Sequence, residues 1–398
     1  MLKCKYAWSH LDFLQGQYAP CYRFKVKPQP IADAEQLPSD VINNDAMQSV
    51  RASLQQGVFP PGCEDCAHKE QHGMQSYRQR SLLDTEWRDD TVDYTTTQGQ
   101  ILDLEIKFSR TCNYYCRHCM ADSNSHFEQL GARNPQIDQQ LQQLSFDHLG
   151  IADSPITTPT PEVLEDIIQN HLDTVQRIRF SGGEPLYHLQ HYKFLERIQH
   201  AQHLKLEYNT NLSMLNFKGY DLKKLWQPFA NIGLTVSMDG VGAMFNYFRQ
   251  QADYDTTVQN LLNIADHVDS IQLVCTTTAY HAFDLANTFD TLTGLAGQLR
   301  QLGVQASVNA TFVHYPQGLD VCNLPDTVTQ ELVELAMAHD NTDSEYIRCR
   351  DSVISAMQRP STCDTDRFAQ IVRLQDQLHS NTCEQFPLLY NFVYGAHK

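Results

Sequence analysis

The stretch ILDLEIKFSRTCNYYCRHCMA, residues 101–121, decides how the rest of the chain is interpreted. Its first part, ILDLEIKFS, has alternating and clustered apolar residues, which is typical of a buried β-strand. Its second part has the spacing C-x3-C-x2-C, formed by Cys112, Cys116 and Cys119. Cysteines that bunch in this way predict a metal or cluster site in the loop that follows the strand.

Five segments downstream have the same pattern of alternating and clustered apolar residues and are predicted strands: IRFSGG (178–183), LKLEYNTN (204–211), IGLTVSMDG (232–240), IQLVCTTT (271–278) and VQASVNATFV (304–313). Helix-like segments lie between them. In PEVLEDIIQNHLD (161–173), Pro161 follows Thr160 at the expected helix start, and apolar residues recur on one face. Strands that alternate with helices predict an α/β fold with a parallel sheet or barrel.

Changes in composition and hydrophobic pattern along the chain predict four regions: a cysteine-rich N-terminal region (1–83), a polar linker (84–100), the α/β domain (101–315) and a mainly helical C-terminal extension (316–398). Within the α/β domain, a polar insertion at residues 122–160 interrupts the order of strands and helices. Two interpretations of this insertion stay open, an active-site lid and a plain surface loop.

Composition limits the classes of function. The net charge of −17 repels phosphate backbones and disfavours a nucleic-acid partner. No apolar run approaches the ~20 residues that span a bilayer, and the first residues lack a secretory pattern, so we expect a cytoplasmic protein without a membrane partner. Seven of the twelve cysteines bunch in the first 119 residues, which favours metal or cluster ligation over disulfides.

Three thiolates on one short loop can hold three irons of a [4Fe–4S] cube, because the complete thiolate set for such a cluster is four. The fourth iron then has an open coordination position for a small chelating ligand, and the amino and carboxylate groups of S-adenosylmethionine (SAM) suit that role. A structural zinc site is the alternative. It needs a fourth ligand, and His118 lies inside the loop, where it would strain the geometry.

A second pattern, IRFSGGEPL, occupies residues 178–186. The adjacent glycines Gly182 and Gly183 let the backbone approach a ligand closely, because neither has a Cβ. Glu184 and nearby main-chain carbonyls can accept hydrogen bonds from an ammonium group, and Pro185 stiffens the turn. Alone, this pattern indicates only a tight turn; after a C-x3-C-x2-C loop it indicates a ligand-binding turn.

Together, CNYYCRHC and FSGGEP resemble the radical SAM superfamily. The resemblance implies a partial (β/α)6 TIM-like barrel in which Cys112, Cys116 and Cys119 are catalytic and hold a SAM-binding [4Fe–4S] cluster. It also implies a set of SAM contacts in the YNTN and SMDG segments and beyond them: Asn209, Asn211, Ser237, Asp239 and Arg249. No stretch that matches the family's adenine contact is evident.

A second set of cysteines consists of Cys4, Cys21, Cys63 and Cys66. Four thiolates saturate a second [4Fe–4S] cluster, although their spacing suits a structural zinc ion equally well. The pattern C-x11-G-x4-C, whose glycine is Gly16, resembles the opening half of SPASM and twitch auxiliary-cluster domains. The segment CEDCAHKEQHGMQSYR also looks like twitch proteins, through these residues: Glu70, Gly73, Ser76 and Arg78. This resemblance implies an N-terminal cysteine-rich auxiliary-cluster (twitch) domain with one auxiliary [4Fe–4S] cluster.

The resemblance implies a radical SAM enzyme that cleaves SAM reductively to a 5′-deoxyadenosyl radical, which abstracts hydrogen from a peptide or small-molecule substrate. It further implies a one-electron donor such as flavodoxin or ferredoxin. Two other functions remain open. One is an activase that generates a radical on a partner protein, and the other is an iron–sulfur electron-transfer or binding module without SAM turnover.

Overall fold

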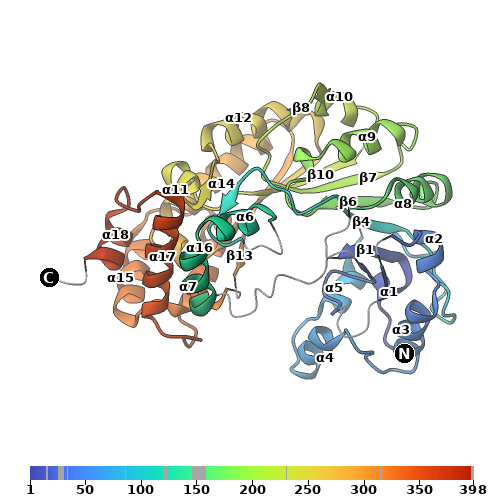
Figure 1. The fold of residues 1–398 in the computed structure, drawn as a ribbon, viewed down its shortest axis with the longest axis horizontal. Helices are drawn as coiled ribbons and strands as arrows, with labels where there is room; N and C mark the ends of the chain where they lie inside the picture. The colour runs from blue at the N-terminus through green and yellow to red at the C-terminus, as the bar shows by residue number, and fades with distance from the viewer. Residues whose placement is uncertain are drawn as a thin grey trace. The chain divides into compact units, whose positions relative to one another are not determined.

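The computed structural model (Figure 1) describes residues 1–14, 17–25, 31–33, 35–85, 87–119, 124–145, 158–229, 231–313 and 316–395. Gly16, which belongs to the N-terminal cysteine pattern, lies outside the described residues. The chain divides into two compact units. Unit 1 comprises residues 1–110, 154–209 and 216–233, and unit 2 comprises residues 111–153, 210–215 and 234–398.

Unit 1 is built on a mostly parallel sheet. Its strands are β1 (His10–Leu14), β2 (Gln17–Ala19), β3 (Ala32–Asp33), β4 (Asp103–Lys107), β6 (Arg177–Ser181), β7 (Lys205–Thr210) and the start of β10 (Asn231–Ser237). They are hydrogen-bonded in the order β3-β2-β1-β4-β6-β7-β10. A row of buried residues crosses the four parallel strands in register: Leu11, Leu104, Ile178 and Leu206.

This apolar face of the sheet is covered by helices. Phe180, two residues after Ile178 on β6, packs edge-on against Phe194 of α9 (Leu189–Arg197), with 6.2 Å between the ring centroids. The other helices of unit 1 are α1 (Lys5–Ser9), α2 (Pro38–Val41), α3 (Asp45–Gln55), α4 (Glu64–Gln71), α5 (Tyr77–Leu83), α8 (Pro161–Asp166) with a π-helical continuation (Ile167–His171), and α10 (Leu222–Trp226). A two-stranded ribbon joins β8 (Asn216–Phe217) to β9 (Tyr220–Asp221).

Unit 2 continues from the end of β10 through β12 (Ser270–Thr277) to β13 (Gln305–Phe312), and β12 and β13 are parallel along their whole length. A separate antiparallel pair joins β5 (Tyr115–Cys116) to β11 (Arg249–Gln250). The helices are α6 (His126–Arg133), α7 (Pro135–Ser145), α11 (Gly242–Phe248), α12 (Tyr254–Ile264), α13 (Ala279–Ala282), α14 (Leu285–Gln301), α15 (Asp326–Ala338), α16 (Ser344–Met357), α17 (Asp366–His379) and α18 (Pro387–Tyr394).

The predicted α/β class is confirmed. All six predicted strands are present as β4, β6, β7, β10, β12 and β13, they follow one another along the sheet in chain order, and helices separate them. The sheet is open, with β13 and β3 at its two ends, as a partial (β/α)6 arrangement requires. The helical C-terminal extension is also confirmed by α15 to α18.

Two features differ in detail from the expected organisation. The N-terminal region contributes β1 to the central sheet, beside β4, which its weak periodicity did not indicate. Part of the insertion at 122–160 forms α6 and α7, and α7 packs against α17. The predicted domain limits and the N-terminal twitch domain remain predictions. No helix among the described residues combines the length and the apolar character that a membrane span requires.

Candidate functional site

The three cysteines of the C-x3-C-x2-C loop lie together in unit 2. Cys112 and Cys116 form a buried cluster with Tyr114, and Cys119 packs against it. Because β5 pairs with β11, Cys116 lies opposite Arg249. The nearby Cys116 thiol and burial raise the pKa of Cys119 well above its usual value. A metal that supplies positive charge would favour the thiolate form of Cys119.

Arg117, within this loop, fixes it to a helix of the C-terminal extension. The fully buried guanidinium places Nη1 3.0 Å from Asp376 Oδ1 on α17 and lies over the Tyr247 ring at 3.8 Å. Gln375, on the same helix, donates its side-chain amide to Arg117 O at 2.7 Å across 258 residues of sequence. No local sequence pattern predicts these contacts, because they join segments that are far apart in the chain.

Side-chain amides orient the Cys112 end of the loop. Asn211 Nδ2 lies 3.8 Å from Cys112 Sγ and 2.9 Å from Asn113 Oδ1. Asn113 in turn donates to Ser213 Oγ at 2.9 Å, and the Ser213 N–H donates back to Asn211 Oδ1 at 2.9 Å. This closed set of hydrogen bonds leaves Asn211 little freedom to rotate beside the cysteine. Asn113 and Ser213 were not singled out by the sequence.

Asp239 and Arg249 form a buried ion pair, with Arg249 Nη2 2.6 Å from Asp239 Oδ2. Burial alone would raise the pKa of Asp239, but Arg249, with His118 and His281, outweighs burial and lowers it. Asp239 Oδ1 also accepts the Thr276 N–H at 2.7 Å. Arg249 Nε is buried without a hydrogen-bond partner among the described residues, which makes it a donor suited to a carboxylate ligand.

The GGEP turn follows β6 in unit 1. Gly182 has φ +100°, and a Cβ at this position would come within 2.8 Å of Ser109 O, so glycine is required here. The Gly183 N–H donates to the same carbonyl at 2.9 Å. Glu184 is buried, and its Oε1 accepts the Leu186 N–H at 3.0 Å, capping the short helix that Pro185 begins. Glu184 therefore shapes the turn itself.

The second cysteine set lines one cavity of unit 1, which contains Cys4, Cys21, Cys63 and Cys66 beside Tyr6, Phe59, Tyr77 and Arg78. Burial raises the pKa of Cys4 to about 11. Burial, together with Cys4 and Cys63, raises the pKa of Cys21 well above its usual value.

The residues after Cys66 form a hydrogen-bonded turn beside this cavity. Arg78 donates to both carboxylate oxygens of Glu70, at 2.9 and 2.6 Å, and to Lys3 O at 2.5 Å. Ser76 Oγ donates to Glu70 Oε1 at 2.5 Å and accepts the Gln79 N–H at the start of α5. Gly73 adopts φ +69°. The residues that carry the resemblance after Cys66 thus lie in one turn.

Three or four thiolates suit a zinc ion as well as an iron–sulfur cluster, and the assignment to a cluster remains a prediction from the resemblance. Among the described residues, one group brings three ligand atoms within 4.8 Å of one another, and it contains no cysteine: His10, Asp12 and Glu105.

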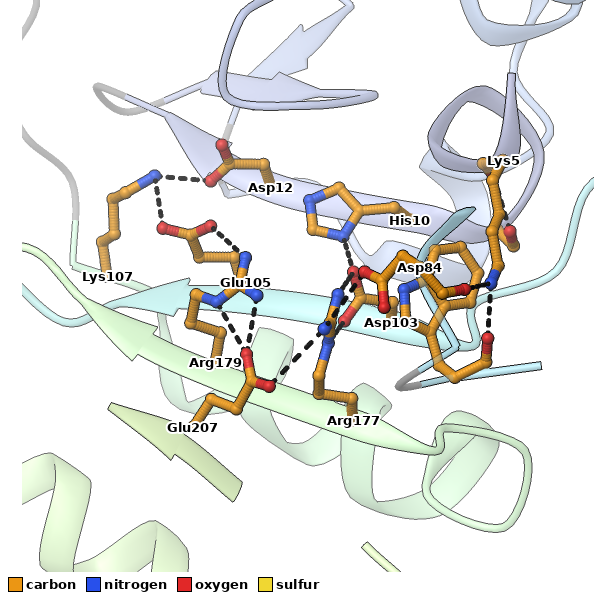
Figure 2. Close-up of polar contacts among 12 residues, drawn as sticks. Lys5, His10, Asp12, Asp84, Asp103, Glu105, Lys107, Arg177, Arg179 and Glu207 are labelled. Carbon is orange, nitrogen blue, oxygen red and sulfur yellow. Dashed lines mark hydrogen bonds and ion pairs between the residues drawn. The ribbon is translucent and has the colours of Figure 1, made fainter. Parts of the chain in front are cut away.

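The second face of the unit 1 sheet carries charged residues that the sequence analysis did not single out (Figure 2). Two rows cross the strands in register: His10, Asp103 and Arg177, then Asp12, Glu105, Arg179 and Glu207. Asp103 accepts from Arg177 Nε and Nη2 at 2.6 and 3.0 Å and lies 2.7 Å from His10 Nδ1. Polar residues at alternate positions, as in Asp103, Glu105 and Lys107, are the signal that could have found this face.

Most predicted site residues therefore gather within one unit or the other. Unit 2 contains Cys112, Cys116, Cys119, Asn211, Asp239 and Arg249, and unit 1 contains Cys4, Cys21, Cys63, Cys66, Gly182, Gly183, Glu184 and Pro185. Asn209 is exposed on β7, and Ser237 is half-buried at the end of β10. The roles assigned to all of these residues remain predictions.

The chain is similar in sequence and in fold to several known proteins. A family model described as the radical SAM superfamily matches residues 106–280. GTP 3′,8-cyclase of Campylobacter lari is 28% identical over 146 residues, which cover 36% of this chain and 38% of that protein. The solved structure of anSMEcpe with bound AdoMet matches at 15% identity and TM-score 0.37, over 59% of this chain and 63% of that chain. Streptococcus suis SuiB bound to S-adenosylmethionine matches at 13% identity and TM-score 0.37, over 73% and 56%. The chain thus spans less than two thirds of each of these proteins.

Proposed function

Because residues 106–280 form a radical SAM domain, we propose that this protein is an enzyme that cleaves SAM reductively and abstracts hydrogen from a peptide or small-molecule substrate. The observation that carries the proposal is the buried three-cysteine loop opposite Arg249, whose Nε has no partner among the described residues. When bound at this loop, a [4Fe–4S] cluster supplies one electron to the sulfonium of SAM, which yields methionine and a 5′-deoxyadenosyl radical.

The residues of the chain hold and orient these groups. Cys112, Cys116 and Cys119 would each bind one iron, which leaves one iron open. Arg249 Nε would donate to the SAM carboxylate, because a guanidinium binds a carboxylate through charge-assisted hydrogen bonds. Asp239 orients that guanidinium through its 2.6 Å ion pair. Cys112 and Cys116 are buried, whereas Cys119 is partly exposed.

The remaining SAM contacts come from the turn and the strand ends. Main-chain carbonyls at Gly182 and Gly183 would accept hydrogen bonds from the SAM ammonium, and Glu184 and Pro185 would hold the turn in shape. Asn209, Asn211 and Ser237 are proposed as further contacts by resemblance. Of these, Asn211 lies beside the three-cysteine loop, since its amide is 3.8 Å from Cys112 Sγ.

We further propose one auxiliary [4Fe–4S] cluster on Cys4, Cys21, Cys63 and Cys66. Four thiolates leave such a cluster no open iron, so it would accept or relay an electron rather than bind SAM. The cavity that all four cysteines line supports this assignment. The first electron would come from a one-electron donor such as flavodoxin or ferredoxin.

The test is an anaerobic assay of the reconstituted protein, reduced with dithionite, for 5′-deoxyadenosine and methionine. Substrate arms contain peptides and GTP, the latter because the Campylobacter relative is named for it. We expect SAM cleavage in the parent protein and in Cys363→Ser, a cysteine outside both sets, and none in Arg249→Gln. Full iron loading without any 5′-deoxyadenosine would overturn the proposal and favour an electron-transfer or binding module.

A further inference from the structure

We propose that His10, Asp12 and Glu105 form a binding site for a divalent first-row transition-metal ion, separate from both cysteine sets. Their ligand atoms lie within 4.8 Å of one another, and the three residues are 1%, 0% and 5% exposed. His10 and Asp12 stand two residues apart on β1, and Glu105 lies opposite Asp12 on β4 (Figure 2). All of the residues that carry this inference belong to unit 1, and it does not depend on the proposed function.

The surroundings of His10 match those of a metal-bound histidine. Its Nδ1 lies 2.7 Å from Asp103 Oδ2, and Arg177 fixes that carboxylate with two further hydrogen bonds. Metal-ligating histidines usually donate their second ring N–H to a carboxylate in this way, which sets the tautomer and the ring orientation. The arrangement leaves Nε2 as the ligand atom.

The carboxylate of Asp12 has one buried oxygen that lacks a hydrogen-bond partner among the described residues. Its Oδ1 lies 2.6 Å from Lys107 Nζ, but its Oδ2 is buried without a hydrogen-bond partner among the described residues. A buried carboxylate oxygen with no partner is costly, and native structures satisfy nearly all such atoms. A cation bound by the Asp12 carboxylate would supply positive charge that this oxygen lacks.

Glu105 offers a carboxylate that is already oriented. Its Oε1 accepts Ser181 Oγ at 2.5 Å and lies 3.3 Å from Lys107 Nζ, whereas Oε2 meets Arg179 only at 3.8 Å. Ligating carboxylates are commonly held by hydrogen bonds of this kind. One imidazole nitrogen and two carboxylate oxygens suit Mn²⁺, Fe²⁺, Co²⁺ or Zn²⁺, and three protein ligands leave open positions for water or a substrate oxygen.

The competing explanation is a self-sufficient network of ion pairs. Negative charges on Asp12, Glu105 and Glu207 face positive charges on Lys107 and Arg179, so the side chains alone could neutralise one another. The two explanations differ in what Lys107 does. In a closed network it is a required partner, but beside a metal ion its positive charge weakens binding.

The test uses Mn²⁺ as the probe and the full chain. Anaerobic titration, with free Mn²⁺ measured from its six-line EPR signal, should give saturable binding of about one ion per chain. Asp12→Asn and Glu105→Gln should weaken binding by about 100-fold or more, and Asp103→Asn by about 10–100-fold. Asp166→Asn, which removes a buried carboxylate 3.5 Å from His171 elsewhere in unit 1, is the matched control and should bind as the parent does.

Lys107→Met provides a change of opposite sign and should bind Mn²⁺ about tenfold more tightly. A misfolded variant cannot bind Mn²⁺ more tightly than the parent. Tighter binding by Lys107→Met together with weaker binding by Asp12→Asn would therefore show that the metal site is lost in Asp12→Asn and that the effect is not misfolding. Absence of saturable binding in both the parent and Lys107→Met would overturn the proposal. Binding by Asp12→Asn that stays within about threefold of the parent would overturn it equally, since a direct ligand loss must cost more than an outer-shell one.

Discussion

Arg117 shows how one side chain inside the cysteine loop sets the position of its neighbours. It is fully buried, its guanidinium pairs with Asp376, and its carbonyl accepts the Gln375 amide. A flexible loop would have to order itself each time a cluster assembled. Here the C-terminal extension holds the loop through Asp376 and Gln375, so Arg117 is a positioning residue for the cysteines on either side of it.

We therefore expect Asp376→Asn to destabilise unit 2 by about 3 kcal/mol, because it leaves the Arg117 charge buried without its counter-ion. The denaturant midpoint of the variant should fall, and so should the iron bound by the triad. Asp351→Asn is the control: this carboxylate is 55% exposed beside Arg350, and losing such a pair costs under about 1 kcal/mol. Equal effects of the two substitutions would contradict this role for Asp376.

Gly182 is the second residue whose identity the structure dictates. Its φ of +100° and the 2.8 Å approach to Ser109 O both exclude a side chain. Gly182→Ala should cost about 1–3 kcal/mol in strain and weaken SAM binding measured by anaerobic equilibrium dialysis. Gly297→Ala, in open space within α14, should instead stabilise the protein by about 0.5–1 kcal/mol. Undiminished SAM binding by Gly182→Ala would count against the proposed turn.

At the scale of elements, Asp166 fastens α2 to α8. Its carboxylate accepts the Ser39 N–H at 2.9 Å, Ser39 Oγ at 2.7 Å and the Asn170 amide at 2.7 Å. Burial alone would raise the pKa of Asp166, but the Ser39 hydrogen bonds, with Asn170 and His171, outweigh burial and lower it. A lowered pKa means that the folded state stabilises the charged carboxylate.

The sign of the pH dependence follows from that shift. The stabilising contribution of Asp166 is fully present above the unfolded pKa of ~3.9 and is lost as the pH falls through the lower folded value. Asp166→Asn should reduce stability at pH 7 by about 1–2 kcal/mol. Urea unfolding of both proteins between pH 3 and 7 should show this difference shrinking at the acid end. A difference that stays constant over that range would contradict the assignment.

For the whole molecule, the central result is that each cysteine set lies within a single compact unit. The triad belongs to unit 2, and the four-cysteine cavity belongs to unit 1. Each set also has its own supporting contacts, Arg117 with α17 in one case and Glu70 with Arg78 in the other. We infer that the two sets load iron independently.

Iron analysis tests that independence. The reconstituted parent should contain about eight irons per chain, and the variants Cys112→Ala/Cys116→Ala/Cys119→Ala and Cys4→Ala/Cys21→Ala/Cys63→Ala/Cys66→Ala should each retain about four. Plasma mass spectrometry that measures iron and zinc together makes the comparison. If the triad variant contains zinc in place of iron, the auxiliary-cluster proposal is wrong. If either variant loses all of its iron, the two cysteine sets do not load iron independently.

The sequence by itself determined those features that depend on neighbouring residues. Six strands, the Thr160 cap of α8, and the cysteine and glycine patterns are visible there because alternation, capping and close spacing are local properties. The α/β class followed from their order along the chain. Close spacing along the chain also marked the cysteines of both sets, but not the residues that support the triad.

Tertiary structure alone decided which distant residues meet. The β1 strand joins the sheet, His10 faces Asp103 across 93 residues, and Gln375 reaches Arg117 across 258. A strand with buried polar side chains, such as β1, lacks the alternation of apolar and polar residues by which strands are predicted. Which strand or helix it packs against depends on residues far away in the chain, which a short stretch of sequence does not include. The proposed His10, Asp12 and Glu105 site therefore emerges only once the strands lie side by side.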